Sequence, residues 1–259
     1  MRKSKTLARI RNKQTVRMCC LGHYIPMFVK HAAHTGFDCI WLDLEHRNMS
    51  DRDVQQLLTQ SHLHDIDIMV RPATIEKTGL YRYLEDGAAG LMIPHVNTAE
   101  KARMLVDAVK YPPIGDRGLD GAGLDADFYI CDTDAFVKHA NQETFLVVQV
   151  ETPQAVNNVD EIASVAGVDG IFIGPGDLGL RLKLDPSNMT LEAAIERVAA
   201  ACARHGKAWG LPTATPDILQ RRQKQGGQLL NHGGEFAAIM NMLRECITAF
   251  ESGEQDAAQ

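Results

Sequence analysis

The chain has 259 residues, of which 45% are hydrophobic and 23% are charged, and its formal net charge is −6 at pH 7. These proportions are typical of a folded globular protein and exclude long disordered segments. The acidic balance also argues against binding to nucleic acid or to an anionic membrane, because both attract a basic surface.

Short apolar, β-rich runs alternate with helical patterns along the chain, which is typical of βα units around a parallel sheet. We expect strands at 16–20, 39–44, 68–71, 90–94, 145–150, 170–173, 207–211 and 228–231. We expect helices at 24–35, 51–62, 77–86, 98–109, 153–165, 190–205, 215–225 and 235–250, and a solvated amphipathic helix near residues 7–11. The count predicts an α/β fold, a (β/α)8 TIM barrel that forms a single domain over 1–259, with a frayed tail at 252–259.

One connection is much longer than the others. Residues 111–141 contain Pro112-Pro113, four glycines and repeated aspartates before a further short helix. A connection of this length in a compact domain indicates a functional loop or an interface.

The six cysteines form no Cys-x-x-Cys pair and no compact disulfide framework, so we expect reduced thiols. The basic N-terminus is not followed by the apolar run of a secretory signal, and no stretch approaches the roughly 20 apolar residues of a membrane span. We therefore expect a cytoplasmic protein.

Polar side chains stand where several of the expected strands end. They are Asp43, Glu45 and His46 at the end of the second strand, Arg71 at the end of the third, His95 at the end of the fourth, Gln149 and Glu151 at the end of the fifth, and Asp177 at the end of the sixth. Because catalytic groups of such barrels come from the C-terminal ends of the strands, these side chains should converge on one face.

Each of these residues has a catalytic and a structural interpretation. Glu151 and Asp177 offer the hard oxygen ligands that Mg²⁺ or Mn²⁺ prefers, although either carboxylate could instead cap a following helix or turn. Arg71 suits a substrate carboxylate or an enolate oxygen, or a structural ion pair with Asp43 or Glu45. His46, with Asp43 nearby, suits general acid–base chemistry.

His95 is left open, because it has no obvious partner in the sequence. None of the eleven lysines lies at the C-terminal end of an expected strand. We therefore expect no Schiff-base lysine, and carbanion stabilisation must come from a metal or from cationic side chains.

Several motifs resemble the HpcH/HpaI family of metal-dependent, class II 2-oxo-acid aldolases over nearly the whole chain. They are Gly36-Phe37-Asp38, Trp41-Leu42-Asp43-Leu44-Glu45-His46, Val70-Arg71-Pro72, Ile93-Pro94, Tyr111-Pro112-Pro113-Ile114-Gly115, Arg117-Gly118, Gln149-Val150-Glu151-Thr152 and the run from Val168 to Leu178. Among the departures, His95 replaces a more usual apolar residue, and the eighth strand is more polar than in the family.

The resemblance implies a role for individual residues. Glu151 and Asp177 would bind a divalent metal (Mg²⁺, Mn²⁺ or Co²⁺), Arg71 would stabilise the enolate oxygen, and His46 supported by Asp43 would move the proton on the aldol hydroxyl. Asp86 resembles an acid lent across a subunit boundary. The substrate-binding residues implied are Gln149, Gly174, Pro175, Gly176, Leu211 and Pro212.

The implied reaction is the reversible cleavage of a 4-hydroxy-2-oxo acid to pyruvate, or a related 2-oxo acid, and an aldehyde through a metal-stabilised enolate. The loop 118–125 would help to select the aldehyde. Family members form homohexamers, as trimers of dimers, which implies a C-terminal helix exchanged between subunits. The alternatives are an acyl-CoA lyase of the malyl or citramalyl type and a non-catalytic binding or assembly barrel.

Overall fold

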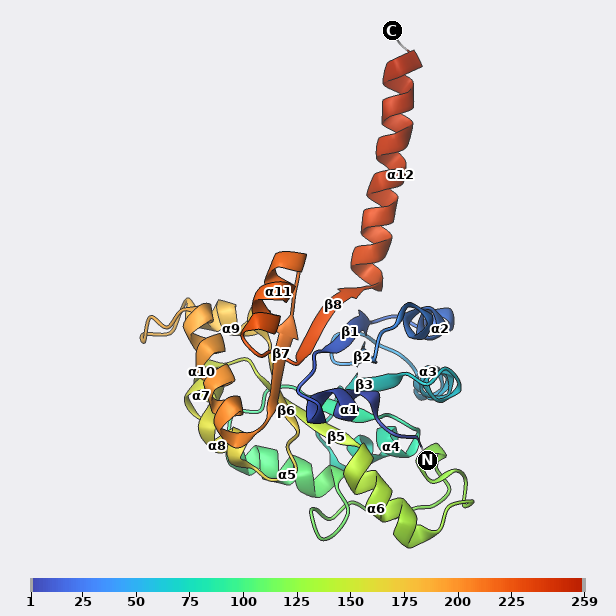
Figure 1. The fold of residues 1–259 in the computed structure, drawn as a ribbon, viewed down its shortest axis with the longest axis vertical. Coiled ribbons are helices and arrows are strands. Elements are labelled where there is room, and N and C mark those ends of the chain that lie inside the picture. Colours follow the sequence, from blue (N-terminus) through green and yellow to red (C-terminus); the bar gives the residue numbers. More distant parts are fainter. Residues whose placement is uncertain (1, 258–259) are drawn as a thin grey trace.

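The computed structural model describes the backbone of residues 2–257 and the side chains of residues 2–252. Its strands close into one parallel barrel in chain order, β1 to β8 (Figure 1). They are β1 Val16–Leu21, β2 Cys39–Asp43, β3 Asp67–Arg71, β4 Gly90–Ile93, β5 Phe145–Val150, β6 Gly170–Ile173, β7 Ala208–Pro212 and β8 Leu229–Gly234. The expected TIM barrel is confirmed, and each strand bound lies within three residues of its expected position.

Most expected helices are present, and all of them except the C-terminal one lie around the barrel. They are α2 Pro26–Thr35, α3 Asp51–Leu63, α4 Lys77–Glu85, α5 Ala99–Val109, α6 Thr133–Glu143, α10 Leu191–His205, α11 Pro216–Lys224 and α12 Glu235–Ala257. The expected helix 153–165 is divided into α7 Pro153–Asn157 and α8 Val159–Ser164. Helix α9 Pro175–Leu182 was not expected, because Gly176 and Gly179 within it are poor helix formers.

The barrel has two apolar layers that alternate along each strand. On β2, Cys39 and Trp41 join the cluster inside the barrel, whereas Ile40 and Leu42 join the cluster between the strands and the helices. This is the period of two expected of a strand. Each fully buried aliphatic side chain contributes about 1.5–3 kcal/mol, so the alternation fixes which residues can face the barrel mouth.

The short helix α1 Lys5–Arg11 closes the end of the barrel at which the strands begin. Leu7 is only 4% exposed and packs with the interior cluster, so the expectation of a solvated helix was wrong for its apolar face. Asp67, at the start of β3, accepts hydrogen bonds from the Ser4 hydroxyl at 2.7 Å and from the Thr6 amide at 2.8 Å. These contacts hold α1 against the strand ends.

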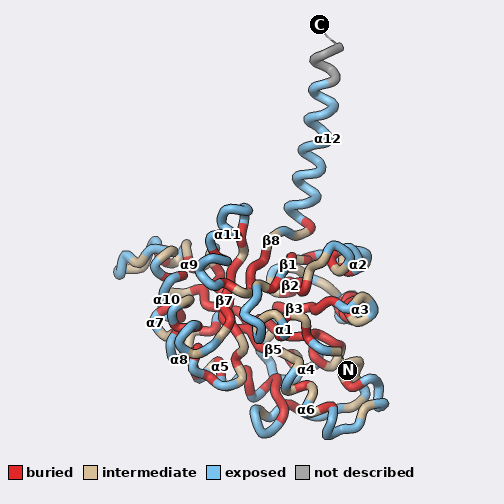
Figure 2. Tube along the Cα trace, in the orientation of Figure 1, coloured by how far each residue is buried: buried red, intermediate tan, exposed pale blue. Residues whose placement is uncertain are grey.

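Helix α12 extends away from the barrel, and after the buried Glu235 at its start the side chains of residues 236–252 are exposed (Figure 2). The expected frayed tail at 252–259 includes residues 258–259, which lie outside the described residues; the helix continues to Ala257. Among the helices of residues 2–257, none combines the length and the apolarity needed to cross a membrane.

Candidate active site

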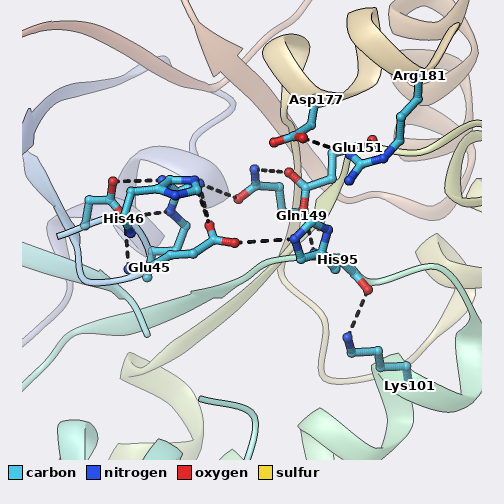
Figure 3. A network of polar contacts seen from close by, with 10 residues as sticks. Glu45, His46, His95, Lys101, Gln149, Glu151, Asp177 and Arg181 are labelled. Carbon is cyan, nitrogen blue, oxygen red and sulfur yellow. Dashed lines mark hydrogen bonds and ion pairs between the residues drawn. The ribbon is translucent and has the colours of Figure 1, made fainter. Parts of the chain in front are cut away.

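Strand alternation brings the polar residues of the sequence motifs to the barrel mouth. On β2 and its continuation, Asp43 and Glu45 follow the inward positions Cys39 and Trp41. On β5, Gln149 follows the inward positions Phe145 and Val147, and Glu151 comes two residues later. Figure 3 shows Glu45, Gln149 and Glu151 meeting as one network.

Arg71 lies on the floor of the site and is 6% exposed. Its Nε and Nη2 contact the two carboxylate oxygens of Asp43 at 2.9 and 2.8 Å, and its Nη1 lies 2.9 Å from a Glu45 oxygen. Burial alone would raise the pKa of Asp43, but the ion pair with Arg71 outweighs it and lowers that pKa. The structural ion pair that the sequence left open is therefore present. Nη1 also points toward the Gln149 carbonyl oxygen, at 3.4 Å.

Glu151 is 2% exposed, and protein donors reach both of its carboxylate oxygens. Oε2 accepts a hydrogen bond from the Gln149 amide at 2.7 Å, and Oε1 accepts one from the main-chain N–H of His95 at 2.7 Å. The Nδ1 atom of His95 lies 2.9 Å from the same Oε1. Burial raises the pKa of Glu151, and the nearby Glu45 and Asp177 carboxylates add to this effect while His95 opposes it.

Three residues form an exposed rim around this buried floor. The side chains of His46, His95 and Asp177 are 54%, 45% and 44% exposed. Asp177 lies in the first turn of α9, and its carboxylate contacts Arg181 Nη1 at 3.1 Å. The same nitrogen donates to the main-chain oxygen of Glu151 at 3.0 Å (Figure 3). Arg181 therefore links the two predicted metal ligands, a role that the sequence did not reveal.

Neither predicted metal ligand acts as a helix cap. The hydroxyl of Thr152, not the Glu151 carboxylate, caps α7, and α9 has no side-chain cap at its N-terminus. The contacts of Glu151 and Asp177 therefore do not support the capping alternative.

Asp43 supports His46 through the main chain. Its Oδ1 accepts hydrogen bonds from the main-chain N–H groups of Glu45 at 3.1 Å and His46 at 3.4 Å. The imidazole of His46 instead faces Glu45, with Nε2 at 3.6 Å from Oε2. Asp43 thus shapes the turn that carries His46, and Glu45 is the carboxylate beside the ring.

The donor set fits a hard divalent cation. The carboxylates of Glu45, Glu151 and Asp177 lie close enough for the other two to raise the pKa of Glu151, an excess of negative charge that a cation would relieve. Within the described residues, no group of three or more His, Cys, Asp or Glu side chains is arranged to hold a metal. Glu151 and Asp177 could offer a hard divalent cation two carboxylates, with its other ligands from water and substrate.

Only some of the predicted substrate-binding residues lie at the barrel mouth. Gly174 is buried against Glu151 and Gln149, and Pro175 and Gly176 open helix α9 beside it. Pro212 ends β7 in the inward register of Ala208. Leu211, one residue earlier, packs in the outer layer between strands and helices, so its predicted substrate contact is corrected: strand alternation turns it away from the mouth.

Two other parts of the expected site, Asp86 and the loop 118–125, make their contacts away from the residues at the barrel mouth. Asp86 follows α4 and accepts a hydrogen bond from Gln55 of α3 at 2.9 Å. Burial raises the pKa of Asp86, and the bond from Gln55 opposes that effect. The loop 118–125 packs beside α4, since a Cβ on Gly123 would lie 2.7 Å from the main-chain oxygen of Glu85. Asp86 and this loop thus contact α3, α4 and residues of the same loop.

Lys101 was also missed from the sequence. It lies in α5 rather than at a strand end, and its Nζ donates to the main-chain oxygen of His95 at 2.9 Å (Figure 3). Burial lowers the pKa of Lys101, while the charge of Glu151 opposes that effect. In this arrangement the amine is directed to a carbonyl oxygen at the edge of the network.

Comparison with known proteins identifies the family of the chain. The family model described as HpcH/HpaI aldolase/citrate lyase matches residues 18–247. The chain is 33% identical to a hydroxypyruvate/pyruvate aldolase of Pseudomonas aeruginosa, over 90% of this chain and 87% of that protein. It is also 33% identical to the 2-keto-3-deoxy-L-rhamnonate aldolase of Escherichia coli K12, over 86% and 84% of the two chains.

A solved structure shares the whole fold. The HpcH/HpaI aldolase from Desulfitobacterium hafniense DCB-2 superposes with a TM-score of 0.88 at 28% identity, and the match covers 95% of this chain and 96% of that one. The family match spans the strand ends that carry the carboxylates, the arginine and the histidines described above. The chain therefore belongs to the HpcH/HpaI aldolase/citrate lyase family.

Proposed function

We propose that the protein is a class II aldolase that uses a divalent metal at Glu151 and Asp177 to cleave 4-hydroxy-2-oxo acids reversibly. The products would be an aldehyde and pyruvate or a related 2-oxo acid. The observation that carries this proposal is the meeting of Glu151, Asp177 and Arg71 at one barrel mouth, with Gln149 in contact with both Glu151 and Arg71. The names of the relatives support aldol chemistry on pyruvate-like donors.

In this mechanism Arg71 stabilises negative charge. Cleavage next to a 2-oxo acid leaves an enolate, and a guanidinium already fixed by two carboxylates needs no reorganisation to stabilise its oxygen. Gln149 keeps the Glu151 carboxylate in place from the floor of the site. A divalent cation held by Glu151 and Asp177 would act as a Lewis acid that polarises the 2-oxo group.

His46 is suited to proton transfer at the aldol hydroxyl. Its ring is half exposed at the rim, so it can reach both substrate and water, while Glu45 at 3.6 Å limits its orientation. We expect His46→Ala to reduce aldol cleavage by about 100-fold or more, in line with the usual contribution of a general acid or base.

The test is exchange of the pyruvate methyl protons for deuterium, followed by NMR. Protein stripped of metal should be inactive, and addition of Mg²⁺, Mn²⁺ or Co²⁺ should restore exchange in the wild type but not in Glu151→Ala. His46→Ala should retain more exchange than aldol cleavage, because enolisation does not involve the aldol hydroxyl. Absence of exchange with every metal would refute the pyruvate donor, and exchange without metal would refute the class II mechanism.

We also propose that α12 is exchanged between subunits of a homohexamer arranged as a trimer of dimers. The helix carries exposed apolar side chains at helical spacing, which include Phe236, Ile239, Leu243 and Ile247, each at least 45% exposed. A cavity of about 250 Å³ lies over β1 and β8 between α2 and α11, the place where an eighth helix would cover the barrel. An apolar stripe without a partner and a gap in the helical layer together favour a second copy of the chain.

A charge on the stripe should weaken this assembly. We expect Leu243→Asp to lower the mass measured by light scattering, whereas Thr248→Asp adds the same charge on another face of α12 and should leave the mass unchanged. An unchanged mass for Leu243→Asp, or a monomeric wild-type protein, would contradict the exchange.

A further inference from the structure

His95 reaches one oxygen of Glu151 twice. Its main-chain N–H donates to Oε1 at 2.7 Å, and its ring Nδ1 lies 2.9 Å from the same atom. The residue adopts a left-handed backbone conformation, with φ of 55°, which is uncommon outside glycine. That conformation brings the amide and the ring together on one acceptor.

The two oxygens of Glu151 are consequently unequal. Oε1 accepts the hydrogen bond from the main-chain N–H of His95, and the ring Nδ1 lies at ion-pair distance from the same oxygen. Oε2 accepts one hydrogen bond from Gln149, so one of its lone-pair sites is free of these protein donors. Oε2 is also the oxygen next to Gly174, at 2.6 Å from the position of an added Cβ, and Asp177 follows three residues later on α9.

We infer that His95 is a positioning residue for the metal: its main-chain N–H and the close contact of its ring Nδ1 hold Oε1 so that Oε2 of Glu151 is presented beside Asp177. This inference rests on the proposed metal site, and it assigns to His95 a part in setting the affinity of that site for the metal. A side chain without a donor would leave Oε1 with the main-chain bond alone, and the carboxylate would rotate more freely.

Glu45 fixes the ring from the opposite side. The His95 Nε2 atom lies 3.5 Å from Glu45 Oε1, so the imidazole spans two carboxylates that come from different strands. Each ring nitrogen thus faces one carboxylate, and Nδ1 is the nitrogen that faces the metal ligand. The positioning role belongs to Nδ1. Two substitutions, one that keeps a donor at the place of Nδ1 and one that keeps a donor at the place of Nε2, can therefore test it.

Asparagine and glutamine provide this matched pair. The amide nitrogen of asparagine stands as many bonds from the main chain as imidazole Nδ1, and that of glutamine corresponds to Nε2. Asparagine also tolerates the left-handed conformation better than most residues. His95→Asn therefore retains the donor to Glu151, whereas His95→Gln and His95→Met remove it.

The experiment is Mn²⁺ binding to the full chain stripped of metal, followed by titration calorimetry and by the electron paramagnetic resonance signal of free Mn²⁺. We expect His95→Gln and His95→Met to raise the Kd for Mn²⁺ about 10-fold or more, the usual effect of losing a partner of a metal ligand. His95→Asn should stay within about threefold of wild type. Urea unfolding with EDTA present should confirm that each variant is folded.

Each outcome decides one point. A Kd for His95→Gln within twofold of wild type, or an equal loss in His95→Asn, would overturn the role of Nδ1. The Glu151→Ala variant separates this from failure of the proposed function: if the wild type binds no Mn²⁺, or binds it as well as Glu151→Ala does, the metal site itself is refuted. Binding that depends on Glu151 but not on residue 95 would refute only the inference on His95.

Discussion

Replacing Gly174 with alanine should disturb the proposed metal site through a single methyl group. A Cβ at this position would lie 2.6 Å from Glu151 Oε2, 2.7 Å from the Gln149 amide nitrogen and 2.9 Å from the Glu151 Cβ. The backbone angles of Gly174, with φ of −89° and ψ of 87°, do not lie in the left-handed region. The expected effect is therefore steric and falls on the side chain of Glu151.

The required displacement can be worked out from these distances. Ordinary contact begins at 3.4 Å, so Oε2 would have to retreat by about 0.8 Å from 2.6 Å. Overpacking of this kind costs about 1–3 kcal/mol of folding free energy. Metal–ligand distances are held to about 0.2 Å, so we expect Gly174→Ala to weaken Mn²⁺ binding about 10- to 100-fold.

Gly179 is the matched control on the same helix. No heavy atom outside its immediate neighbours lies within 4 Å of the position of its Cβ, so Gly179→Ala should keep the Mn²⁺ affinity. It should also stabilise α9 by about 0.5–1 kcal/mol, because alanine is the better helix former. The assay is calorimetric Mn²⁺ titration with urea unfolding of both variants. Equal Mn²⁺ affinities for Gly174→Ala and Gly179→Ala would refute the steric reasoning.

Three further predictions concern charge and packing. Arg71→Met leaves buried carboxylates without their counter-ion and should cost about 3 kcal/mol in urea unfolding at pH 7, besides abolishing pyruvate enolisation; an unchanged midpoint would contradict it. The hydrogen-bonded ion pair with Arg222 lowers the pKa of Glu192 to about 2, and burial has a smaller, opposing effect. The ionised Glu192 therefore stabilises the folded protein above pH 4.5, and this stabilisation is lost as the pH falls toward 2. Glu192→Gln should therefore destabilise the protein by about 1–3 kcal/mol at pH 7 and clearly less at pH 3, and equal penalties in urea unfolding at the two pH values would disprove the assignment. Leu7→Ala should cost about 2–4 kcal/mol if α1 truly closes the barrel, whereas a loss below about 0.5 kcal/mol would mean a solvated helix.

The barrel could be predicted from the sequence because its strands are buried on both faces. A run such as Phe145-Leu146-Val147-Val148 is apolar at every position, so its type is readable from the sequence. Helix α9 could not be predicted in the same way, because two of its eight residues are glycines whose positions are open to solvent. The orientation of α12 was equally out of reach, since its periodicity predicts an apolar face but not the surface that this face contacts.

The site could be predicted as a set of residues but not as a set of contacts. The strand ends predicted that Glu151, Asp177 and Arg71 would converge, yet not that Arg181 would link the two acids from the next turn of α9. Arg181 has a readable signal in its spacing of four from Asp177, which places both on one face of a helix. That signal becomes visible only once the helix itself is recognised.

Glu45 shows how much strand register alone could have supplied. It follows Cys39, Trp41 and Asp43 at steps of two, so the alternation that turns these side chains inward also turns Glu45 inward. The structure places its carboxylate beside Arg71, His46 and His95, which makes it a central acid of the network. For His95 no such periodicity exists, because its contacts depend on a left-handed turn after β4 and on an acceptor 56 residues away. Sequence patterns therefore predict side chains that a regular strand aims at the site, and they miss those that an irregular backbone brings there.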